Sequence, residues 1–502
     1  MSTGPPESAT YRRALELVAA GRHEQALACL REYLLARPKD AHALNDAGAI
    51  LYALGQHEQA ARHLRIALDQ LGGYPPQPVW NLAEVYLADA KTAELLALLD
   101  ELRAAGALQT ELANHVATRL IQGGDLAGGI EALLRSFQVS PRQDELMGLY
   151  QRARSARPKV AFFCDFGDPR FAEEILEFLR ARFDTRLLAD DDPGRIAPLL
   201  DWCDVAWFEW CGSQVLAASH MPKSCRMICR LHGQEVFLPW PAKVNWANID
   251  LLVTSGNANV LRCLRRQVPG LQRHTRTITI PCGVNVEAFE PVPPKRGKQL
   301  ACLSRLDYLE NFPLVLQCFC KLHSIDEEFR LFLAGPAQQN GMLREYMDAM
   351  VGELDLTGAV VFDGSPASRG DWFQDKHYIV SCSVHEGHPV HVLEGMACGL
   401  KPVVHAWPGC RDFFPQPYLF RTVDEFCQRI LEPSWQPQAY RDFVAQRYPL
   451  ARQLDRVNDL FIRIEKDLAD TRTASRDAAN ARDGEQSGKK QQKSPPHSLY
   501  PC

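Results

Sequence analysis

Glu386-Gly387-His388-Pro389-Val390-His391-Val392-Leu393-Glu394 begins just after one predicted strand and leads into a predicted helix. The apolar run at residues 378–382 is typical of a strand buried on both faces of a parallel sheet. The helix pattern ends at Gly399, and Pro402-Val403-Val404 predicts the next strand. A strand, a helix and a second strand in this order predict one unit of a parallel α/β sheet.

The same stretch has the chemistry of an anion site. Gly387 lets the backbone approach a ligand closely, and Pro389 has the φ angle favoured in the first turn of a helix. Free N–H groups at a helix start, with the positive end of the helix dipole, suit a phosphate or diphosphate. Glu386 and Glu394 add carboxylates that accept hydrogen bonds from hydroxyl groups. The stretch therefore predicts a sugar-nucleotide site.

Strand and helix patterns alternate from Pro158 to the last predicted helices of the chain. Such alternation predicts doubly wound α/β sheets, which bind ligands at the carboxyl ends of their strands. Two such series would face each other across a cleft. We therefore predict a first Rossmann-like domain at 158–292, a second at 293–436, helices crossing back onto the first at 437–468, and a disordered tail at 469–502.

The first third of the chain contains a repeat. Gly21-Arg22-His23-Glu24-Gln25-Ala26 returns 34 residues later as Gly55-Gln56-His57-Glu58-Gln59-Ala60, and the apolar positions between fall at helical spacing. The array resembles tetratricopeptide repeats, which place two antiparallel helices in each unit, and it covers residues 7–156. Stacked units of this kind form an all-α solenoid with a groove. The groove predicts a bound peptide or protein partner; a spacer or oligomerisation arm is the alternative.

The composition is that of a soluble globular protein, with 502 residues, 46% hydrophobic residues, 23% charged residues and a net charge of −5. This charge excludes a general attraction to nucleic acid. Sixteen cysteines without regular spacing, no signal peptide and no apolar run of about 18 residues predict a cytoplasmic protein with reduced thiols. Arginines between Arg262 and Arg276 make one region basic. A solvated helix and loop is the favoured interpretation there, and peripheral membrane contact the less favoured one.

Several motifs resemble those of one enzyme family. The stretch from Glu386 to Glu394 is similar to the Glu-x7-Glu motif of the retaining glycosyltransferases with the GT-B fold, the family 4-like enzymes. Four other segments match that family in order and spacing, and the resemblance runs from about Lys159 to about Asp467. The segments are Ile278-Thr279-Ile280-Pro281-Cys282-Gly283-Val284-Asn285, Leu303-Ser304-Arg305-Leu306, Leu333-Ala334-Gly335-Pro336 and Met396-Ala397-Cys398-Gly399-Leu400-Lys401-Pro402-Val403-Val404. The resemblance implies transfer of a sugar from a nucleotide-diphosphate sugar to an acceptor hydroxyl, with retention of configuration, no cofactor and no metal.

The resemblance also implies a role for each polar group in the stretch. Glu386 would face the donor sugar near the reacting carbon, and Glu394 would hold the ribose hydroxyls. Backbone N–H groups of Gly387 and His388 would contact the diphosphate, while Pro389 has no N–H to donate. The structural alternatives are a charge stabilised by the helix dipole for Glu386 and a solvated helix residue for Glu394.

Three residues outside the stretch complete the implied site. Arg305 would neutralise the leaving diphosphate through its planar fork of donors. His232, at the end of a first-domain strand, would donate a hydrogen bond on the sugar or acceptor side. Gly167 follows the first strand, where the family places a glycine-containing loop over the diphosphate. The alternatives are a surface arginine and a structural histidine.

One position departs from the family pattern. Family members have a lysine five or six residues after the arginine, where this chain has Glu310 and Asn311. A glutamate facing a diphosphate is repulsive, at a cost on the order of several kcal/mol in a partly dry cleft. If Glu310 turns outward, Asn311 becomes the donor at this place; Lys401 or Arg411 are the substitute cations.

Two other interpretations stay open. The missing lysine favours a catalytically weakened or inactive scaffold that acts through its repeats. The inverting O-linked N-acetylglucosamine transferases also join such repeats to a GT-B core, although the Glu-x7-Glu pattern favours the retaining family over them. The leading interpretation predicts three partners: a nucleotide-sugar, a protein or glycan acceptor, and a protein bound in the repeat groove.

Overall fold

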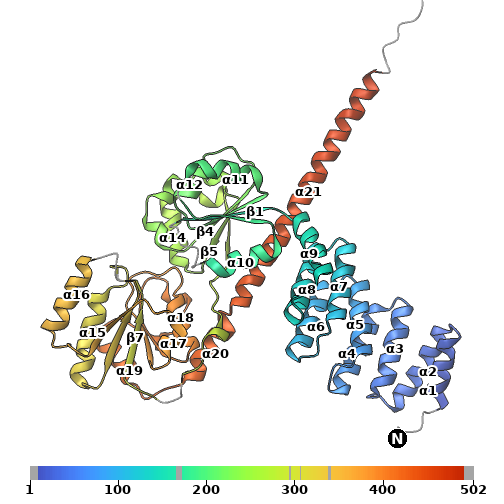
Figure 1. Cartoon of the computed structure of the whole chain (residues 1–502), viewed down its shortest axis with the longest axis horizontal. Helices are drawn as coiled ribbons and strands as arrows, with labels where there is room; N and C mark the ends of the chain where they lie inside the picture. The colour runs from blue at the N-terminus through green and yellow to red at the C-terminus, as the bar shows by residue number, and fades with distance from the viewer. Residues whose placement is uncertain are drawn as a thin grey trace, which may run out of the picture. The chain divides into compact units, whose positions relative to one another are not determined.

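The computed structural model describes residues 9–165, 172–190, 192–292, 296–305, 307–336 and 341–490. The chain divides into two compact units, one made of Met1–Arg157 with Arg182–Asp184 and the other of Pro158–Ala181 with Thr185–Cys502. The first unit is helical, and the second contains two parallel sheets (Figure 1). The predicted succession of an all-helical region and two α/β domains is confirmed.

Short turns join the helices of the first unit, so that neighbours in sequence pack as antiparallel pairs. Within the described residues these helices are α1 (Ala9–Ala19), α2 (His23–Ala36), α3 (Ala41–Ala53), α4 (His57–Leu71), α5 (Pro76–Ala88), α6 (Thr92–Ala104), α7 (Thr110–Gln122), α8 (Leu126–Val139) and α9 (Asp144–Ala156). Leu30, Leu64, Leu98 and Leu133 lie in α2, α4, α6 and α8, and each is fully buried. Their spacing of 34 or 35 residues shows that every pair buries the same face.

The turn inside each pair has a repeated backbone feature. Gly21, Gly55 and Gly124 adopt φ angles of 71°, 73° and 89°, and Ala90 adopts 51° at the equivalent place of the third pair. Left-handed φ angles are open to glycine and costly for residues with a Cβ atom. The degenerate third unit therefore keeps the turn of its neighbours without their glycine.

Ala90→Gly is expected to stabilise the protein by about 0.5–1 kcal/mol, because it removes the Cβ strain of a left-handed alanine. Urea unfolding, followed by the far-ultraviolet circular dichroism of the helices, would measure the change in the free energy of unfolding. Ala97→Gly, at an exposed position inside α6, is the matched control and is expected to destabilise by about 1 kcal/mol. A loss of stability in Ala90→Gly equal to that of the control would contradict the strain argument.

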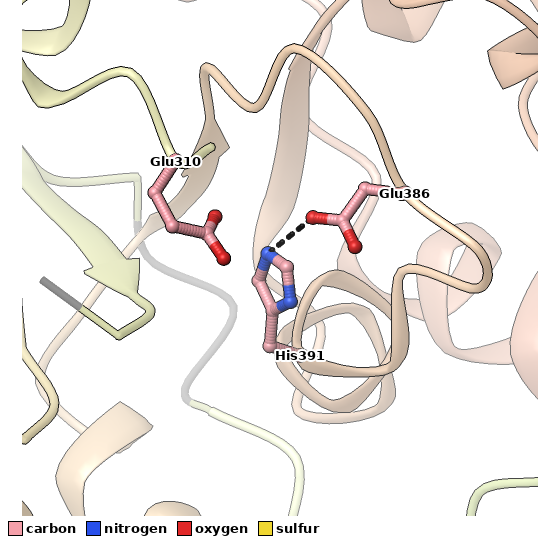
Figure 2. A group of neighbouring side chains, drawn as sticks. All are labelled: Glu310, Glu386 and His391. Atoms are coloured by element: carbon pink, nitrogen blue, oxygen red, sulfur yellow. Dashed lines mark ion pairs between the residues drawn. The ribbon is translucent and has the colours of Figure 1, made fainter. Parts of the chain in front are cut away.

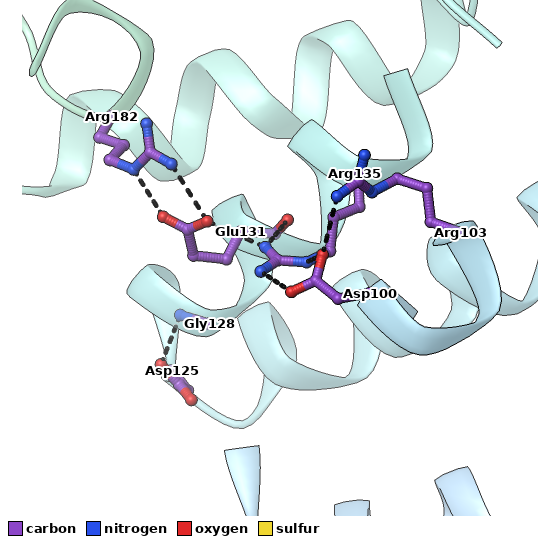
Figure 3. Close-up of polar contacts among 7 residues, drawn as sticks. All are labelled: Asp100, Arg103, Asp125, Gly128, Glu131, Arg135 and Arg182. Carbon is purple, nitrogen blue, oxygen red and sulfur yellow. Dashed lines mark hydrogen bonds and ion pairs between the residues drawn. The ribbon is translucent and has the colours of Figure 1, made fainter. Parts of the chain in front are cut away.

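A chain of ion pairs joins α6 to α8 in the first unit (Figure 3). Arg135 donates to both carboxylate oxygens of Asp100, at 3.0 Å and 2.7 Å, and to Glu131 at 3.0 Å. Arg182, which belongs to the same unit, donates to Glu131 at 2.5 Å and 3.1 Å. The side chains of Glu131, Arg135 and Arg182 are 12%, 17% and 13% exposed, so water screens the two ion pairs of Glu131 less than pairs at the surface.

The first sheet of the second unit has the strand order β2-β1-β3-β4-β5-β6, with every pair parallel. Its strands are β1 (Val160–Cys164), β2 (Thr185–Leu188), β3 (Val205–Glu209), β4 (Arg226–Leu231), β5 (Leu251–Thr254) and β6 (Arg276–Thr279). Helices α10 (Glu173–Arg182), α11 (Ile196–Trp202), α12 (Ser213–Ser219), α13 (Trp240–Lys243) and α14 (Ala258–Gln267) connect them. Strands β1 and β3 are buried along their whole length, as expected of a parallel sheet covered on both faces.

The second sheet has the order β12-β11-β10-β7-β8-β9 and is also parallel. Its strands are β7 (Gln299–Leu303), β8 (Arg330–Ala334), β9 (Val360–Gly364), β10 (Tyr378–Ser381), β11 (Lys401–His405) and β12 (Leu419–Phe420). Its helices are α15 (Phe312–Ile325), α16 (Gly341–Glu353), α17 (Arg369–Phe373), α18 (Val390–Ala397) and α19 (Val423–Leu431). The direction of the strand order reverses between β10 and β7, and the carboxyl ends of these two strands supply the residues described below.

Two helices follow the second sheet, α20 (Pro437–Arg447) and α21 (Leu450–Lys490). The ring of Phe461 on α21 stacks on Trp207 of the first sheet, with 6.2 Å between ring centroids. Helix α21 then continues to Lys490, which corrects the predicted disorder over the first part of residues 469–502. Five alanines, three arginines and two lysines among residues 469–490 favour the helix, although few residues of this segment can build a core.

The cysteines of the described residues all carry free thiols, and most are buried. None of the helices in that part of the chain combines the length and the apolar character that crossing a bilayer requires.

Candidate functional site

The loop between β10 and α18 lies against the backbone of the first sheet domain. A Cβ atom on Gly387 would sit 1.2 Å from the carbonyl oxygen of His232, and one on Gly233 would sit 2.7 Å from the Cα atom of Gly387. Ser255 donates to the carbonyl of Gly387 at 3.0 Å, and Asn257 donates to that of Glu386 at 2.6 Å. The close backbone approach that the sequence predicts at Gly387 is thus made by the other domain.

Glu386 and Glu310 face each other across one serine. Ser383 Oγ lies 2.8 Å from Oε1 of Glu386 and 2.7 Å from Oε2 of Glu310. His391, on α18, has its Nε2 atom 4.0 Å from the same Glu386 oxygen (Figure 2). Glu310 therefore points into the site and not outward, so the arrangement in which Asn311 replaces it is not present.

Burial raises the pKa of Glu386 well above its usual range, and the neighbouring Glu310 raises it further. Burial also raises the pKa of Glu310, against smaller opposing effects of Ser304, Ser383 and Arg305. His391 is driven the other way, because burial and then Arg369 lower its pKa to about 4. His391 is consequently neutral near pH 7, and it does not neutralise the carboxyl groups.

Glu394 is paired with Arg369 of α17. The Nη1 atom of Arg369 donates to both carboxylate oxygens, at 2.8 Å and 2.9 Å. Burial raises the pKa of Glu394, although Arg369 acts to lower it. The oxygens that the family resemblance assigns to ribose hydroxyls thus already accept hydrogen bonds within the chain.

His232 belongs to a buried charged cluster at the carboxyl ends of β3 and β4. Its Nε2 atom lies 2.7 Å from Oε1 of Glu209, which also accepts from Arg230 Nη1 at 2.6 Å. Trp207 donates its indole N–H to the other Glu209 oxygen at 2.7 Å, and Trp210 stacks on the imidazole with 3.9 Å between centroids. Burial opposes ionisation of Glu209, yet Arg230 and His232 lower its pKa to about 2.

The structure distributes the other predicted residues around this centre. Arg305 donates to the side chain of Gln234 in the first domain at 3.1 Å and lies 3.3 Å from Asp307. Asn311 precedes α15 with a left-handed φ of 54°, so its position serves the turn. Gly167 lies outside the described residues.

His388 packs edge-on against Phe413 and Tyr448, at centroid distances of 5.0 Å and 5.4 Å. Burial, then the nearby charge of Arg230, lowers its pKa to about 3. The imidazole is therefore neutral near pH 7. Within the described residues neither ring nitrogen has a hydrogen-bond partner.

A concave pocket lies at the carboxyl ends of β7, β8 and β9, in the same domain as Glu310 and Glu386. Gly335 shapes it: a Cβ atom there would sit 1.8 Å from the carbonyl oxygen of Ser304. Arg344 covers one side, with its guanidinium 3.9 Å from the ring centre of Phe362. The lining residues are Ser304, Phe312, Leu333, Ala334, Gly335, Arg344, Phe362 and Gly364.

Residues 297–432 match the family model described as glycosyl transferases group 1. The second sheet domain matches the glycosyl transferases of group 1. This segment contains Arg305, Glu310, Glu386, His391 and Glu394, so the match spans the second domain's half of the site. It does not reach the helical unit or the first sheet.

A curated relative and two solved structures extend the comparison. Alpha-monoglucosyldiacylglycerol synthase of Streptococcus pneumoniae (strain ATCC BAA-255 / R6) is 26% identical over 113 residues, 22% of this chain and only 25% of that protein. Sucrose-phosphate synthase from Thermosynechococcus elongatus is 16% identical with a TM-score of 0.51, covering 61% of this chain and 99% of that one. HepE from Anabaena, in complex with UDP and glucose, is 13% identical with a TM-score of 0.50 and the same coverages. The two structures show that the sheet domains share the GT-B fold.

Several contributors to the site were not predicted from the sequence, among them Glu209, Arg230, Ser383, His391 and Arg369. A signal existed for Glu209, since it ends the buried strand β3 and Arg230 stands at the matching register of β4. Charged residues at the carboxyl ends of adjacent buried strands indicate a polar site. Arg369 gave no comparable signal, because it lies 25 residues from its partner on a separate short helix.

Proposed function

We propose that this protein is a glycosyltransferase that moves a sugar from a nucleotide-diphosphate sugar to a hydroxyl group of an acceptor. The observation that carries the proposal is the match of residues 297–432 to the glycosyl transferases of group 1, which includes every second-domain residue of the site. The fold shared with HepE and sucrose-phosphate synthase supports it. The pocket beside Gly335 is the place for the nucleoside, since it lies at the carboxyl ends of the strands.

The proposed reaction proceeds with retention of configuration and without a metal or cofactor. The bond between the anomeric carbon and the diphosphate oxygen breaks, and the leaving diphosphate gains negative charge. Arg305 supplies positive charge near it, and the start of α18 supplies N–H groups. The acceptor oxygen forms the new bond on the same face and loses its proton to the leaving diphosphate. Glu386 orients the sugar, and His232, held by Glu209, contacts the sugar or acceptor from the first domain.

The helical unit is proposed to recruit a protein acceptor or a protein partner, in the manner of tetratricopeptide repeats. Support comes from the 34-residue period of its buried leucines and left-handed turns. The free buried thiols agree with a proposed cytoplasmic location.

A second candidate function is a binding protein with a weakened transferase site. Two contacts favour it. Glu310 points toward Glu386, where an anionic donor would meet it, and Arg369 holds both oxygens of Glu394. A sugar-nucleotide would have to bind beside these groups or displace them.

Thermal-shift measurement against UDP-, GDP- and ADP-sugars separates the two functions. A donor present at about 100 times its Kd stabilises the folded protein by about 2.7 kcal/mol, and one of the three sugar-nucleotides is expected to raise Tm. The shift should be lost in Arg305→Ala and kept in Arg463→Ala, an exposed arginine on α21. Transfer to a protein acceptor, with NMR of the product's anomeric centre and a chelator control, tests retention and metal independence. No shift with any donor at millimolar concentration would favour the binding protein.

A further inference from the structure

The two carboxyl groups of the site share a single hydroxyl. Ser383 Oγ is within hydrogen-bond distance of both Glu310 and Glu386, at 2.7 Å and 2.8 Å. A serine hydroxyl has one hydrogen and can donate to one carboxylate only. If both glutamates were ionised, the second would face a lone pair of the serine oxygen at hydrogen-bond distance. Ser381 does not remove this conflict, since its Oγ contacts Ser383 at 3.1 Å and not the second carboxylate. Ser304, also near Glu310, does not remove it either, since among the described residues its Oγ has no hydrogen-bond partner.

The surrounding charges do not resolve the conflict either. In the described residues, Arg305 and Asp307 flank the pair from the loop before α15 and pair with each other at 3.3 Å. His391 faces it from α18 at 4.0 Å and is neutral near pH 7. Arg369 of α17 is committed to Glu394, and His405 of β11 contacts the carbonyl of Ser383 at 3.3 Å. Two carboxylates in a mostly buried site would lack an adequate counter-charge.

We propose that Glu310 and Glu386 hold one proton between them through Ser383, so that the site presents one carboxylic acid and one carboxylate near neutral pH. Every group then has a matching partner: the acid donates to Ser383 Oγ, and Ser383 donates to the carboxylate. Glu310 is thereby a positioning residue that keeps Glu386 in place without a second negative charge. The high pKa of both groups supports this arrangement.

The consequence for ligand binding rests on the proposed function, whereas the inference of a shared proton does not depend on that function. The O–H of the acid is already donated to Ser383, so the protonated pair acts on an anionic donor through its charge and not through a hydrogen bond. The singly protonated pair carries one negative charge and the doubly ionised pair carries two, so the diphosphate of a donor is repelled more strongly by the doubly ionised pair. Donor affinity should fall as pH rises through the higher pKa of the pair.

The proton is tested first on the ligand-free protein. A carboxyl group with a raised folded-state pKa stabilises the fold below its unfolded pKa of about 4.3, and this contribution is lost as pH rises through the folded pKa. Wild-type Tm should consequently fall relative to that of Glu310→Gln between about pH 5 and about pH 9, by at least about 2 °C. Glu345→Gln, an exposed glutamate on α16, should follow the wild-type curve. Parallel curves for wild type and Glu310→Gln would overturn the proposal.

Infrared difference spectra give a second readout that does not depend on a variant's stability. Wild type minus Glu310→Gln near neutral pH should contain the C=O band of a protonated carboxylic acid, and wild type minus Glu345→Gln should not. Absence of the band would overturn the proposal. So would a rise of wild-type Tm with Mg²⁺ or Mn²⁺ after chelator treatment that is lost in Glu310→Gln and His391→Gln, because a cation would then neutralise the pair.

The effect of pH on donor affinity is measured separately, with the sugar-nucleotide that shifts Tm. Wild-type affinity should weaken about tenfold or more between about pH 6 and about pH 9, while Glu310→Gln should hold its affinity within about twofold. If the ligand-free tests detect the shared proton but no donor binds, the proposed transferase function would be refuted and the proposal of the shared proton would not. Donor binding with equal pH profiles in both proteins would refute the shared proton alone.

Discussion

Glu209→Ala is expected to destabilise the protein by about 3–5 kcal/mol, because it leaves Arg230 charged and buried without its partner. Arg230 is 1% exposed and Glu209 is 0% exposed, and the two side chains meet at 2.6 Å. Trp207 and His232 lose the acceptor for their ring nitrogens in the same variant. Equilibrium denaturation, followed by tryptophan fluorescence of the sheet domains, would measure the loss.

A double-mutant cycle separates the charge from the packing. Replacing both members, in Glu209→Leu with Arg230→Met, should cost less than Glu209→Leu alone, since no unpaired charge stays buried. The pH dependence has a defined sign: the pKa of Glu209 is lowered to about 2, so its contribution is present above the unfolded value of about 4.3 and is lost as pH falls through about 2. A cost below about 1 kcal/mol for Glu209→Ala would show that water or a rearranged partner compensates Arg230.

Gly387→Ala is expected to cost at least about 3 kcal/mol and to abolish any donor-induced stabilisation. The added methyl group would lie 1.2 Å from the carbonyl oxygen of His232 and 2.4 Å from its carbonyl carbon. These are backbone atoms, so no side-chain rotation relieves the overlap. The loop must move away, and the hydrogen bonds from Ser255 and Asn257 to it would break.

Thermal unfolding of Gly387→Ala beside Gly352→Ala tests this contact. Gly352 lies in α16 with open space around its Cα atom, so alanine there should be neutral or stabilise by up to about 1 kcal/mol. If Gly387→Ala unfolded at the wild-type temperature with its donor response intact, the contact between the domains would not be required for the site.

Local sequence patterns were sufficient to predict most of the fold. The apolar run at 378–382 and the helix that follows it became β10 and α18, because burial on both faces of a parallel sheet leaves a plain apolar signal. The repeat at Gly21 and Gly55 likewise located the helical pairs. The prediction of disorder was wrong for residues 469–490, because the alanine, arginine and lysine residues of this segment favour a helix although they cannot build a core.

The candidate site was harder to predict, since its contacts join residues that are distant in sequence. Arg230 opposes Glu209 only because β3 and β4 are neighbours in exact parallel register, and the sequence does not specify strand neighbours. The direction of the Glu310 side chain depends on Ser383, 73 residues further along the chain. The sequence predicts close approach at Gly387, but which backbone approaches it depends on how the two sheet domains meet.

The helical unit has a consequence for how such a chain can change length. Each pair ends its first helix with the same left-handed turn and buries the same leucine, at intervals of 34 or 35 residues. Excision or duplication of one whole interval would join surfaces that already match, whereas any other length would misalign them. The array can therefore grow or shrink by whole helical pairs while the contacts between neighbouring pairs stay the same. Evolution or engineering can thus change the length of the helical unit without redesigning a core.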